Sequence, residues 1–332
     1  MSGMVGGQIV PGDVRTRAEL KELFGGGTQG GICPSRTTAN VLVFTDPSVG
    51  EAQGYHDGWL AEEDEYGPVF EYTGHGQGDQ TFEGLHGTGN RAILQHVDEG
   101  RALRLFKAVG KVPGTGTKLQ RYLGRFELDN IQPYVVREAP NDKGIMRRVI
   151  VFRLRPIEEE FERRDDDAIP PAPKTQATSV AADVTTSAIV EPEINKKTKS
   201  SRSAAPKTVA ERREAELADR FLAFMGARGR KLRRFQIKVK GLTSTLLTDL
   251  YDEQAHVLYE LKGTSTREAV RMAIGQLLDY SRHVQPAAPQ LAVLLPEAPH
   301  DDLRALLESL GITLAYWDGK TFVGVPGLDP SV

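Results

Sequence analysis

Two carboxylates and a lysine in the C-terminal half of the sequence have the types and spacing that metal-assisted phosphate chemistry needs. Asp249 precedes Glu260 and Lys262 by a short turn. Residues two apart in a strand point to the same face, so Glu260 and Lys262 should project together, and an antiparallel hairpin would place Asp249 beside them. Two close carboxylates repel each other unless a cation lies between them, and their oxygen atoms suit Mg²⁺.

Such a metal, held by Asp249 and Glu260, would polarise a phosphate and lower the pKa of a bound water. Lys262 would position that water or neutralise the developing charge. The alternative is a solvated strand face on which these side chains form an ordinary cross-strand ion pair.

A second run of interest lies in the N-terminal half, where Gly74, Gly76 and Gly78 are separated by single residues. Glycines at this spacing make a backbone that another group can approach closely. The run is not a Walker loop, because no Gly-Lys-Ser/Thr follows it. It also lacks the later glycine and the helix start of a dinucleotide fingerprint.

The elements that must hold the carboxylates alternate between helices and strands after residue 207. Apolar residues at helical spacing predict an amphipathic helix over 208–225, and apolar runs bounded by turns predict strands. The order of these elements indicates an α/β sandwich around a short mixed sheet. The further predicted elements are strands over 245–251, 256–261, 290–295 and 313–317, and helices over 266–283 and 301–310.

The glycine run sits among elements of another kind. The N-terminal half has short apolar runs punctuated by Gly and Pro, which predict a sheet or barrel of short strands with helices near 15–24 and 89–99. Between the halves, residues 161–206 are rich in Ala, Pro, Ser, Thr and charge, which predicts a disordered linker. The sequence therefore divides into a domain over 1–160, this linker, and a domain over 207–332.

Length and composition exclude several classes of protein. The 332 residues suit two domains, and 42 Lys and Arg against 45 Asp and Glu leave a net charge of −3, which argues against a histone-like binder of nucleic acid. One cysteine, Cys33, excludes a disulfide scaffold and any metal site of cysteines alone. No stretch approaches the ~20 apolar residues of a membrane span and no secretory signal opens the sequence, so we expect a cytoplasmic protein.

Asp249 and the run Glu260-Leu261-Lys262 together resemble the PD-(D/E)XK nucleases. Thr248 stands where the family name has a proline, and the resemblance covers residues 208–325. It implies a Mg²⁺-dependent nuclease, in which Mn²⁺ substitutes, with Asp249 and Glu260 as the metal ligands.

Two helices of the same half extend this resemblance. Gln276 and Tyr280 match a Gln-x-x-x-Tyr pattern on the helix after the catalytic strand. The family often places a metal-supporting Glu on its first helix, for which Glu216 is our choice and Glu214 the alternative. The implied active site comprises Asp249, Glu260, Lys262, Gln276 and Glu216.

A basic run lies between the first helix of this half and the hairpin. It contains Arg230, Lys231 and Arg233. Such a run is often a solvated face only, but beside a phosphodiesterase site it indicates contacts to DNA phosphates.

Several spaced motifs surround the glycine run, namely Tyr72-Thr73-Gly74, Asp79-Gln80, Asn90-Arg91-Ala92 and Ala102-Leu103-Arg104-Leu105. Together they resemble the SRA domain, the SET- and RING-associated reader of modified cytosine in DNA, over residues 7–156. The resemblance implies a PUA-like β-barrel with flanking helices, which flips one base out of the duplex.

The resemblance further implies a pocket in which the flipped base stacks on aromatic rings and is read along its Watson–Crick edge. Tyr72 would contribute by stacking and Thr73 by a polar contact. Tyr55 is the candidate for the second aromatic, although a core position is its alternative. Asp57 is the candidate for the base-reading carboxylate, which would favour cytosine by accepting from its amino group. Asp64 is the alternative to Asp57.

The loop over 25–31 is expected to enter the space that the flipped base leaves, with Thr28 and Gln29 at the DNA. Only Gln77-Gly78 separates Gly76 from Asp79, so the long basic finger of the eukaryotic members is missing. Because that finger is missing, the resemblance does not imply a preference for hemimethylated sites.

The sequence thus predicts an α+β protein with an SRA-like barrel, a flexible linker and an α/β nuclease sandwich. We expect a type IV-like restriction endonuclease that flips 5-methylcytosine or 5-hydroxymethylcytosine in double-stranded DNA and cuts nearby with Mg²⁺. A homodimer is expected to cut both strands, and the linker to let cleavage fall at a variable distance. The alternative is a reader of modified DNA whose nuclease-like domain serves docking or dimerisation. No contact with a membrane is expected.

Overall fold

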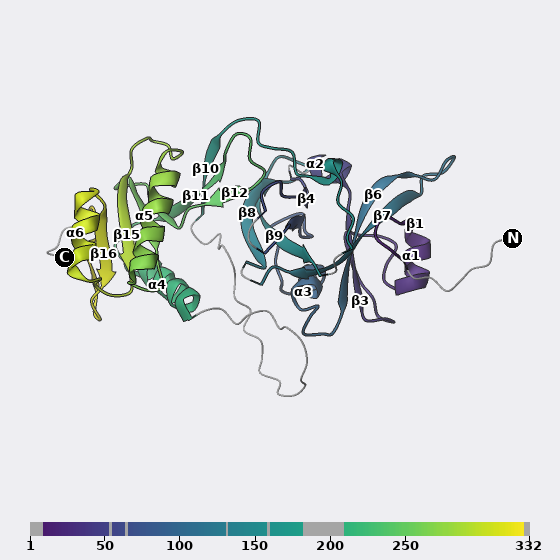
Figure 1. Ribbon diagram of the computed structural model, residues 1–332, viewed down its shortest axis with the longest axis horizontal. Coiled ribbons are helices and arrows are strands. Elements are labelled where there is room, and N and C mark those ends of the chain that lie inside the picture. The colour runs from purple at the N-terminus through teal and green to yellow at the C-terminus, as the bar shows by residue number, and fades with distance from the viewer. Residues whose placement is uncertain are drawn as a thin grey trace. The chain divides into compact units, whose positions relative to one another are not determined.

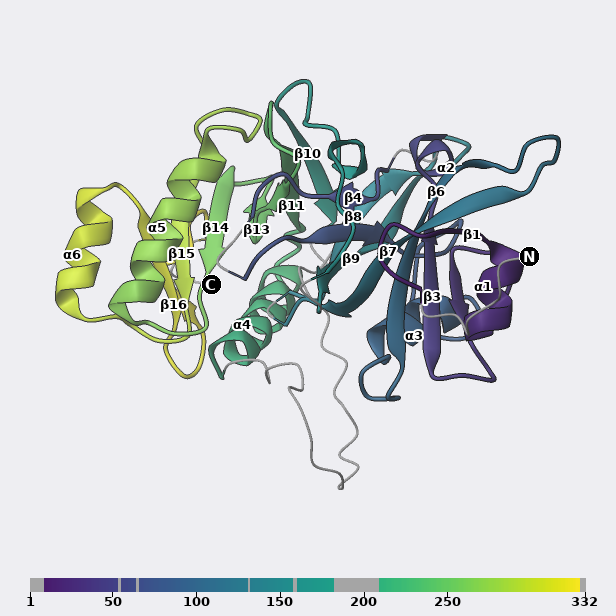
Figure 2. The same ribbon diagram turned by 45° about the vertical axis from the view of Figure 1, so that its right-hand side comes forward.

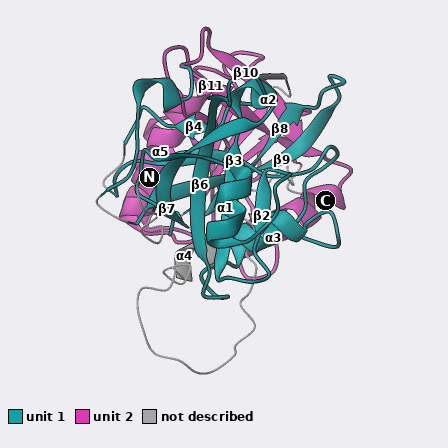
Figure 3. Cartoon of the chain, turned by 90° about the vertical axis from the view of Figure 1, so that its right-hand side faces the viewer, with its two compact units in different colours: residues 1–170, 185–204 teal, residues 171–184, 205–332 magenta. Residues whose placement is uncertain are grey.

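The computed structural model describes residues 9–52, 55–63, 66–130, 132–157, 160–181 and 209–328. These residues divide into two compact units, which Figure 3 colours separately. Unit 1 comprises the described residues up to Pro170, and unit 2 comprises those from Pro171 onward. Within these ranges, no helix is both long and apolar enough to cross a membrane.

Unit 1 is built on one sheet of nine strands (Figures 1 and 2). Its main path runs β2-β3-β6-β7-β9-β5-β4, with β1 beside β7 and β8 beside β9. The strands are β1 Val14–Thr16, β2 Ile32–Pro34, β3 Asn40–Thr45, β4 Gly58–Trp59, β5 Phe70–Thr73, β6 Ala102–Lys111, β7 Lys118–Leu128, β8 Tyr134–Pro140 and β9 Met146–Pro156. The helices are α1 Arg17–Phe24, α2 Pro47–Ala52 and α3 Thr88–Leu94, with a 3₁₀ turn η1 at Asp165–Asp167.

Local sequence explains where unit 1 begins its first helix and what the sheet buries. Thr16 caps α1, because its hydroxyl accepts from the N–H of Glu19 while the Glu19 carboxylate accepts from the N–H of Thr16. The sheet packs around a core that includes Trp59, Phe70 and Phe126. Burial of these large apolar side chains is the main favourable contribution to the folding of unit 1.

Unit 2 is a three-layer sandwich. Its eight-stranded sheet follows the order β10-β11-β13-β14-β15-β16-β17, with β12 beside β11. Apolar residues of α4 pack on one face of the sheet, and those of α5 and α6 pack on the other (Figure 2). The strands are β10 Gln176–Ala181, β11 Leu232–Lys238, β12 Thr245–Leu247, β13 Leu250–Asp252, β14 Val257–Leu261, β15 Gln290–Leu295, β16 Thr313–Trp317 and β17 Phe322–Val323. The helices are α4 Val209–Gly226, α5 Arg267–Ser281 and α6 Asp301–Ser309.

Two features of unit 2 differ from the prediction. The basic run contains a strand, β11, because Phe235 and Ile237 between its charged residues are buried in the core. The single strand expected over 245–251 is two strands, β12 and β13, which are separated at Thr248 and Asp249. This break places Asp249 at a strand end rather than within a regular ladder.

The predicted linker over 161–206 begins too early. Unit 1 continues through η1, and β10 belongs to the sheet of unit 2, where it pairs with β11 along its whole length. Composition hides β10 because only Val180 among its six residues is fully buried, and backbone hydrogen bonds hold the strand. Residues 182–206 of the predicted linker lie outside the described residues. The first domain boundary therefore moves from residue 160 to Pro170.

Candidate functional site

The three residues predicted to act on a phosphate lie together in unit 2. β13 and β14 form an antiparallel pair whose register brings Asp249 to the level of Glu260. The Oδ2 atom of Asp249 accepts a hydrogen bond of 2.7 Å from the backbone N–H of Leu261. The ammonium group of Lys262 donates to Oε1 of Glu260 at 2.7 Å. The hairpin thus gathers two carboxylates and a lysine at the end of β14, and we call these three residues the carboxylate cluster.

Burial and charge set the protonation of the cluster. Glu260 is 1% exposed, and its burial, followed by the charge of Asp249, raises its pKa well above the ordinary value. Burial lowers the pKa of Lys262, but the nearby carboxylates, Glu260 foremost, outweigh burial and raise it. The Oε2 atom of Glu260 is buried and makes no hydrogen bond to any residue that the structure describes. A bound cation would relieve the repulsion between the carboxylates and give this oxygen a partner.

The two carboxylates of the cluster suit Mg²⁺, which binds through few protein ligands, better than a metal that needs many. Among the described residues, no group of three or more His, Cys, Asp or Glu side chains could hold a metal ion. Mg²⁺ usually binds through one or two carboxylates and takes its other ligands from water and phosphate oxygens. Asp249 and Glu260 fit that pattern.

A buried arginine beside the cluster is not among the predicted site residues. Arg234 lies on β11, and its Nε donates to the backbone carbonyls of Thr248 at 2.8 Å and Asp249 at 3.0 Å. Its Nη2 is 3.8 Å from Oδ1 of Asp249. Burial lowers the pKa of Arg234, and the charges of Asp249 and Glu260 oppose that shift. The sequence shows Arg234 only as part of the basic run, and the folded position of β11 is needed to place it at the carboxylates.

Glu214, rather than Glu216, reaches the cluster from α4. Its Oε2 accepts from the backbone N–H of Gly263 at 3.2 Å, and its charge contributes to the raised pKa of Lys262. Glu214 lies three residues before the buried Leu217 and so shares its face of the helix, whereas Glu216 is exposed. Of the two glutamates that the sequence offers, the structure therefore brings Glu214, and not Glu216, to the carboxylate cluster.

Gln276 and Tyr280 lie near the cluster on α5. The Nε2 atom of Gln276 is 3.5 Å from the Tyr280 hydroxyl. The Oε1 atom of Gln276 is buried and has no hydrogen-bond partner in the described part of the chain. Burial raises the pKa of Tyr280, the bond from Gln276 lowers it, and the charges of Glu260 and Asp249 raise it further. The Gln-x-x-x-Tyr pattern thus brings both side chains close to the carboxylates.

Two of the three residues predicted to contact DNA from the basic run have partners within unit 2. Arg230 forms an ion pair of 2.5 Å with the buried Asp252. Arg233 donates to backbone and side-chain oxygens of β10 and lies 3.3 Å from Glu253. Both arginines therefore hold strands of the sheet together, and only Lys231 of the three predicted cations is exposed without such a role.

Unit 1 contains a cavity of about 780 Å³ at the ends of β3 and β5, which we call the base pocket. A cavity of this size is typical of sites for small ligands. Asp64, the alternative base reader, lies outside the described residues. All six residues predicted to contact the base or its strand line the pocket, namely Thr28, Gln29, Tyr55, Asp57, Tyr72 and Thr73.

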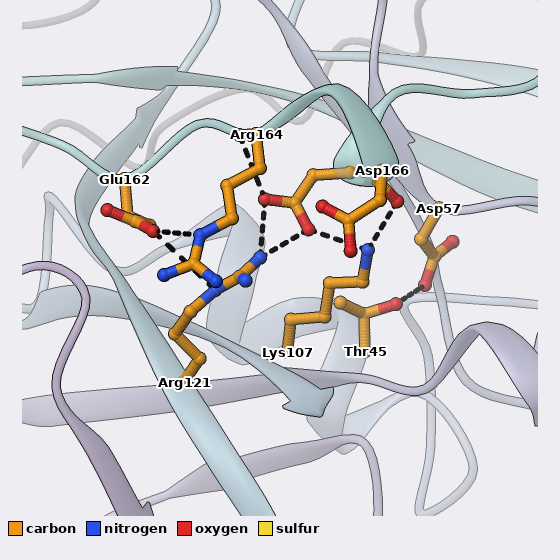
Figure 4. A network of polar contacts seen from close by, with 8 residues as sticks. Thr45, Asp57, Lys107, Arg121, Glu162, Arg164 and Asp166 are labelled. Carbon is orange, nitrogen blue, oxygen red and sulfur yellow. Dashed lines mark hydrogen bonds and ion pairs between the residues drawn. The ribbon is translucent and has the colours of Figure 1, made fainter. Parts of the chain in front are cut away.

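Both carboxylate oxygens of Asp57 are fixed by hydrogen bonds. Oδ1 accepts from the backbone N–H of Thr73 at 2.7 Å. Oδ2 accepts from the hydroxyl of Thr45 at 2.9 Å, a bond that Figure 4 shows. Burial raises the pKa of Asp57 to about 6, although these bonds act in the opposite direction. Asp57 is therefore an oriented carboxyl group that titrates just below neutral pH.

Two tyrosines supply aromatic surface to the base pocket. Burial, followed by the charge of Asp57, raises the pKa of Tyr55 to about 12 and that of Tyr72 well above its ordinary value. Gly31 lets the loop after α1 approach Tyr72, because a Cβ atom at Gly31 would lie 2.7 Å from the Tyr72 hydroxyl.

Arg17 fixes the loop that carries the predicted DNA-contacting residues. Its guanidinium donates to the carbonyl of Gly30 at 2.6 Å and to that of Thr28 at 3.5 Å. The same group lies 3.9 Å from the centroid of the Phe44 ring. These contacts tie the loop to α1 at the edge of the base pocket.

A buried ion network adjoins the base pocket (Figure 4). Lys107 lies beside Thr45 in the register of β3 and β6. Its ammonium group donates to Oδ1 of Asp167 at 2.6 Å and to the carbonyl of Asp166 at 2.7 Å. Arg121 also donates to Asp167, at 2.5 Å to Oδ2. The network fastens η1, near the end of unit 1, to strands that border the pocket.

One family of known proteins matches this chain within unit 1. The family described as ScoMcrA-like, SRA domain, matches residues 11–169. No curated protein matches the sequence. The structure is similar to that of the type IV phosphorothioation-dependent restriction endonuclease ScoMcrA, with 21% identity, 47% of this chain and 28% of that chain covered, and a TM-score of 0.33.

Two further solved structures are similar to this one. The SRA domain of SUVH5 in complex with methylated DNA has 21% identity, with 49% of this chain and 99% of that chain covered and a TM-score of 0.31. The DNA recognition domain of LpnPI, a cytosine modification-dependent restriction endonuclease, has 8% identity. The match covers 43% of this chain and 68% of that chain, with a TM-score of 0.32. The chain spans 28% and 43% of the first two matched structures, both of ScoMcrA.

Proposed function

We propose that the chain is a modification-dependent DNA endonuclease, from the premise that residues 11–169 match the ScoMcrA-like SRA-domain family. Unit 1 would flip 5-methylcytosine or 5-hydroxymethylcytosine out of double-stranded DNA, and unit 2 would hydrolyse a phosphodiester bond nearby. The observation that carries the proposal is the carboxylate cluster of unit 2, because recognition of a base alone does not require it.

Recognition would use the geometry of the base pocket. An extruded base stacks on aromatic side chains and offers its Watson–Crick edge to hydrogen-bonding groups. Tyr55 and Tyr72 provide the aromatic surface, and Thr73 a polar contact. Asp57 in its ionised form accepts from the amino group of cytosine, whereas the carbonyl oxygen of thymine at the same place would meet a second acceptor.

Hydrolysis would use the carboxylate cluster. Asp249 and Glu260 would hold Mg²⁺, or Mn²⁺ in its place, which supplies a water of lowered pKa and polarises the phosphate. Lys262 carries a positive charge, because its pKa is raised, and would neutralise charge that develops on the phosphate oxygens. Glu214 and Arg234 act on the backbone, since they hold Gly263 and the strand break at Asp249.

Cutting both strands of a duplex requires two attacks in opposite directions. The described part of the chain shows one carboxylate cluster. We therefore expect two copies of the chain to act as a homodimer on modified DNA.

The test is a cleavage assay with Mg²⁺ on one plasmid in unmodified, 5-methylcytosine, 5-hydroxymethylcytosine and adenine-methylated forms. Cutting should be confined to the cytosine-modified forms. Asp249→Ala should reduce cutting by at least about a hundredfold, because a metal ligand is lost, while binding to modified DNA persists. Asp219→Ala, which removes an exposed carboxylate of α4, should cut like the wild type.

Three results of this assay would redirect the proposal. Equal cutting of all forms would keep the nuclease and discard the recognition of modified cytosine. Selective binding without any cutting would make the chain a reader whose unit 2 serves docking or dimerisation. Unchanged cutting by Asp249→Ala would show that the carboxylate cluster is not the active site.

A further inference from the structure

A glutamine in the wall of the base pocket has an amide group with no hydrogen-bond partner among the described residues. Gln120 lies on β7 and lines the pocket, and its side chain is 1% exposed. Both amide atoms, Oε1 and Nε2, are buried, and neither makes a hydrogen bond to any residue that the structure describes. Buried polar groups nearly always have a partner, so a side chain that leaves both a donor and an acceptor unpaired needs a specific explanation.

The rest of this wall shows that the unpaired amide is particular to Gln120. Alternate residues of a strand share a face, and Lys118, two residues earlier on β7, also lines the pocket. Its ammonium group is already paired with the carboxylate of Asp46, another residue of the wall. Asp57 has both oxygens bonded within unit 1. Gln120 is thus the lining residue whose buried side-chain amide has neither of its atoms bonded within the described part of the chain.

We propose that Gln120 selects a flipped cytosine whose C5 substituent carries a hydroxyl group, so that 5-hydroxymethylcytosine is preferred over 5-methylcytosine. This inference rests on the proposed recognition of a flipped cytosine by unit 1. A hydroxyl group donates to the Oε1 atom of an amide or accepts from its Nε2, whereas a methyl group does neither. A methyl group against this wall would leave the amide buried and unpaired, which is the costly arrangement for a polar group.

The size of the pocket agrees with this inference. Its volume of about 780 Å³ lies in the upper part of the range for small-ligand sites, which agrees with a ligand larger than an unsubstituted base. Sites built to hydrogen-bond a ligand group discriminate strongly against the analogue that lacks it, whereas one extra carbon alone changes affinity little. We expect the wild-type protein to bind the hydroxymethylated site about tenfold more tightly than the methylated one.

The experiment is a fluorescence-anisotropy titration of the full chain without divalent metal. Three duplexes of one sequence carry cytosine, 5-methylcytosine or 5-hydroxymethylcytosine at a single position. The variant is Gln120→Met, which keeps an unbranched side chain of similar length and removes the amide. The matched control is Gln95→Met, which makes the same change at the end of α3, away from the pocket lining.

Gln120→Met should abolish the difference in affinity between the hydroxymethylated and methylated duplexes, because the amide that tells the two substituents apart is gone. Gln95→Met should retain the wild-type preference. Equal wild-type affinity for the two modified duplexes, or tighter binding of the methylated one, would overturn the inference while the proposed function stands. Weakening of all three duplexes alike by Gln120→Met would also overturn it, because Gln120 would then contact the DNA backbone.

Two further results distinguish a failure of this inference from a failure of the proposed recognition of modified cytosine. Wild-type protein that binds all three duplexes equally would overturn the proposed recognition of modified cytosine itself. If Gln120→Met fails to fold, the inference is tested with the wild-type protein alone, by measuring its affinity for a duplex that carries 5-formylcytosine. The formyl oxygen only accepts, so it satisfies Nε2 but not Oε1, and its affinity should fall between those of the methylated and hydroxymethylated duplexes. Affinity at or below that of the methylated duplex would contradict the role of Gln120.

Discussion

Asp57 combines a fixed orientation with a pKa close to neutral. Its two oxygens accept from Thr73 and Thr45, which favour the charged form, yet burial raises its pKa to about 6. The folded protein therefore keeps a proton on Asp57 over a range in which the unfolded chain has lost it. Stability contributed by this group falls as the pH rises from about 4 to about 6. The proposed recognition would have the opposite dependence, because only the ionised form of Asp57 could accept from the amino group of cytosine.

Binding of modified DNA should therefore weaken as the pH falls through about 6, by about tenfold per pH unit below the midpoint. Thr45→Val removes a hydrogen bond that favours the ionised form, so its midpoint should move to higher pH. The measurement is anisotropy with one modified duplex from about pH 5 to 8, without metal. Asp57→Asn, which cannot ionise, should bind weakly with no such midpoint. Wild-type affinity that is flat over this range would exclude Asp57 as the reader of the base.

The base pocket also shows which of its residues can be predicted from the sequence and which cannot. Tyr72 and Thr73 belong to a motif, and Tyr55 and Asp57 were located by their place before it. Gln120 belongs to no motif, and an amide within a strand gives no signal of its own. Its burial and lack of a partner depend on how β7 pairs with β1 and β6, so only the structure identifies it.

The break between β12 and β13 is the element that places Asp249. The hydroxyl of Thr248 accepts from the N–H of Phe235 at 2.8 Å, and the N–H of Thr248 donates to the carbonyl of Phe235 at 3.0 Å. Arg234 adds hydrogen bonds to the carbonyls of Thr248 and Asp249. β11 therefore fixes the backbone on both sides of the break, and the carboxylate of Asp249 is positioned through it.

Loss of this support should impair catalysis more than DNA binding. Arg234→Met should lower kcat for cleavage by at least about a hundredfold with little change in KM, because Asp249 is displaced while unit 1 is untouched. Arg234→Lys, which restores the charge but not the forked donors, should recover only part of the rate. Arg271→Met, an exposed arginine of α5, is the control. If Arg234→Met cleaves DNA at the wild-type rate, Arg234 is not needed to hold the backbone at the break between β12 and β13.

The same elements show what the sequence pattern could and could not predict. Periodicity found α4, α5 and α6 and the strands around the carboxylate cluster. It missed β11, because Arg233 and Arg234 among its apolar residues resemble a solvated basic run. The choice between Glu214 and Glu216 depends on which face of α4 is buried, and Leu217 settles it only once the packing is known.

The two units are joined by a very short stretch of chain. The N–H of Ile169 donates to the carbonyl of Trp59 in unit 1 at 2.8 Å. The N–H of Ala172 donates to the carbonyl of Leu242 in unit 2, also at 2.8 Å. Only Pro170 and Pro171 lie between these anchored residues, and consecutive prolines form a stiff connection. A junction of two prolines favours a narrow range of cleavage distances over the variable one expected for a long flexible linker.

Cleavage products mapped by sequencing should thus cluster at a narrow range of distances from the modified cytosine. Insertion of about twelve Gly and Ser residues between Pro170 and Pro171 should broaden that range, because a flexible chain replaces the stiff junction. The same insertion between Thr185 and Thr186 is the control, since β10 before it and α4 after it both belong to unit 2. A broad range of distances in the unaltered protein would contradict the role of the junction.

β10 has a consequence for how such a protein exchanges its parts during evolution. The polar stretch after residue 181 resembles a natural seam, yet a recombination there would carry β10 away with unit 1 and strip the sheet of unit 2 of its outermost strand. β11 would then present unpaired backbone groups, which invite aggregation. A domain boundary at Pro170 and Pro171 leaves both units whole. Lineages that exchanged the domain corresponding to unit 1 should therefore have joined the new domain at these prolines.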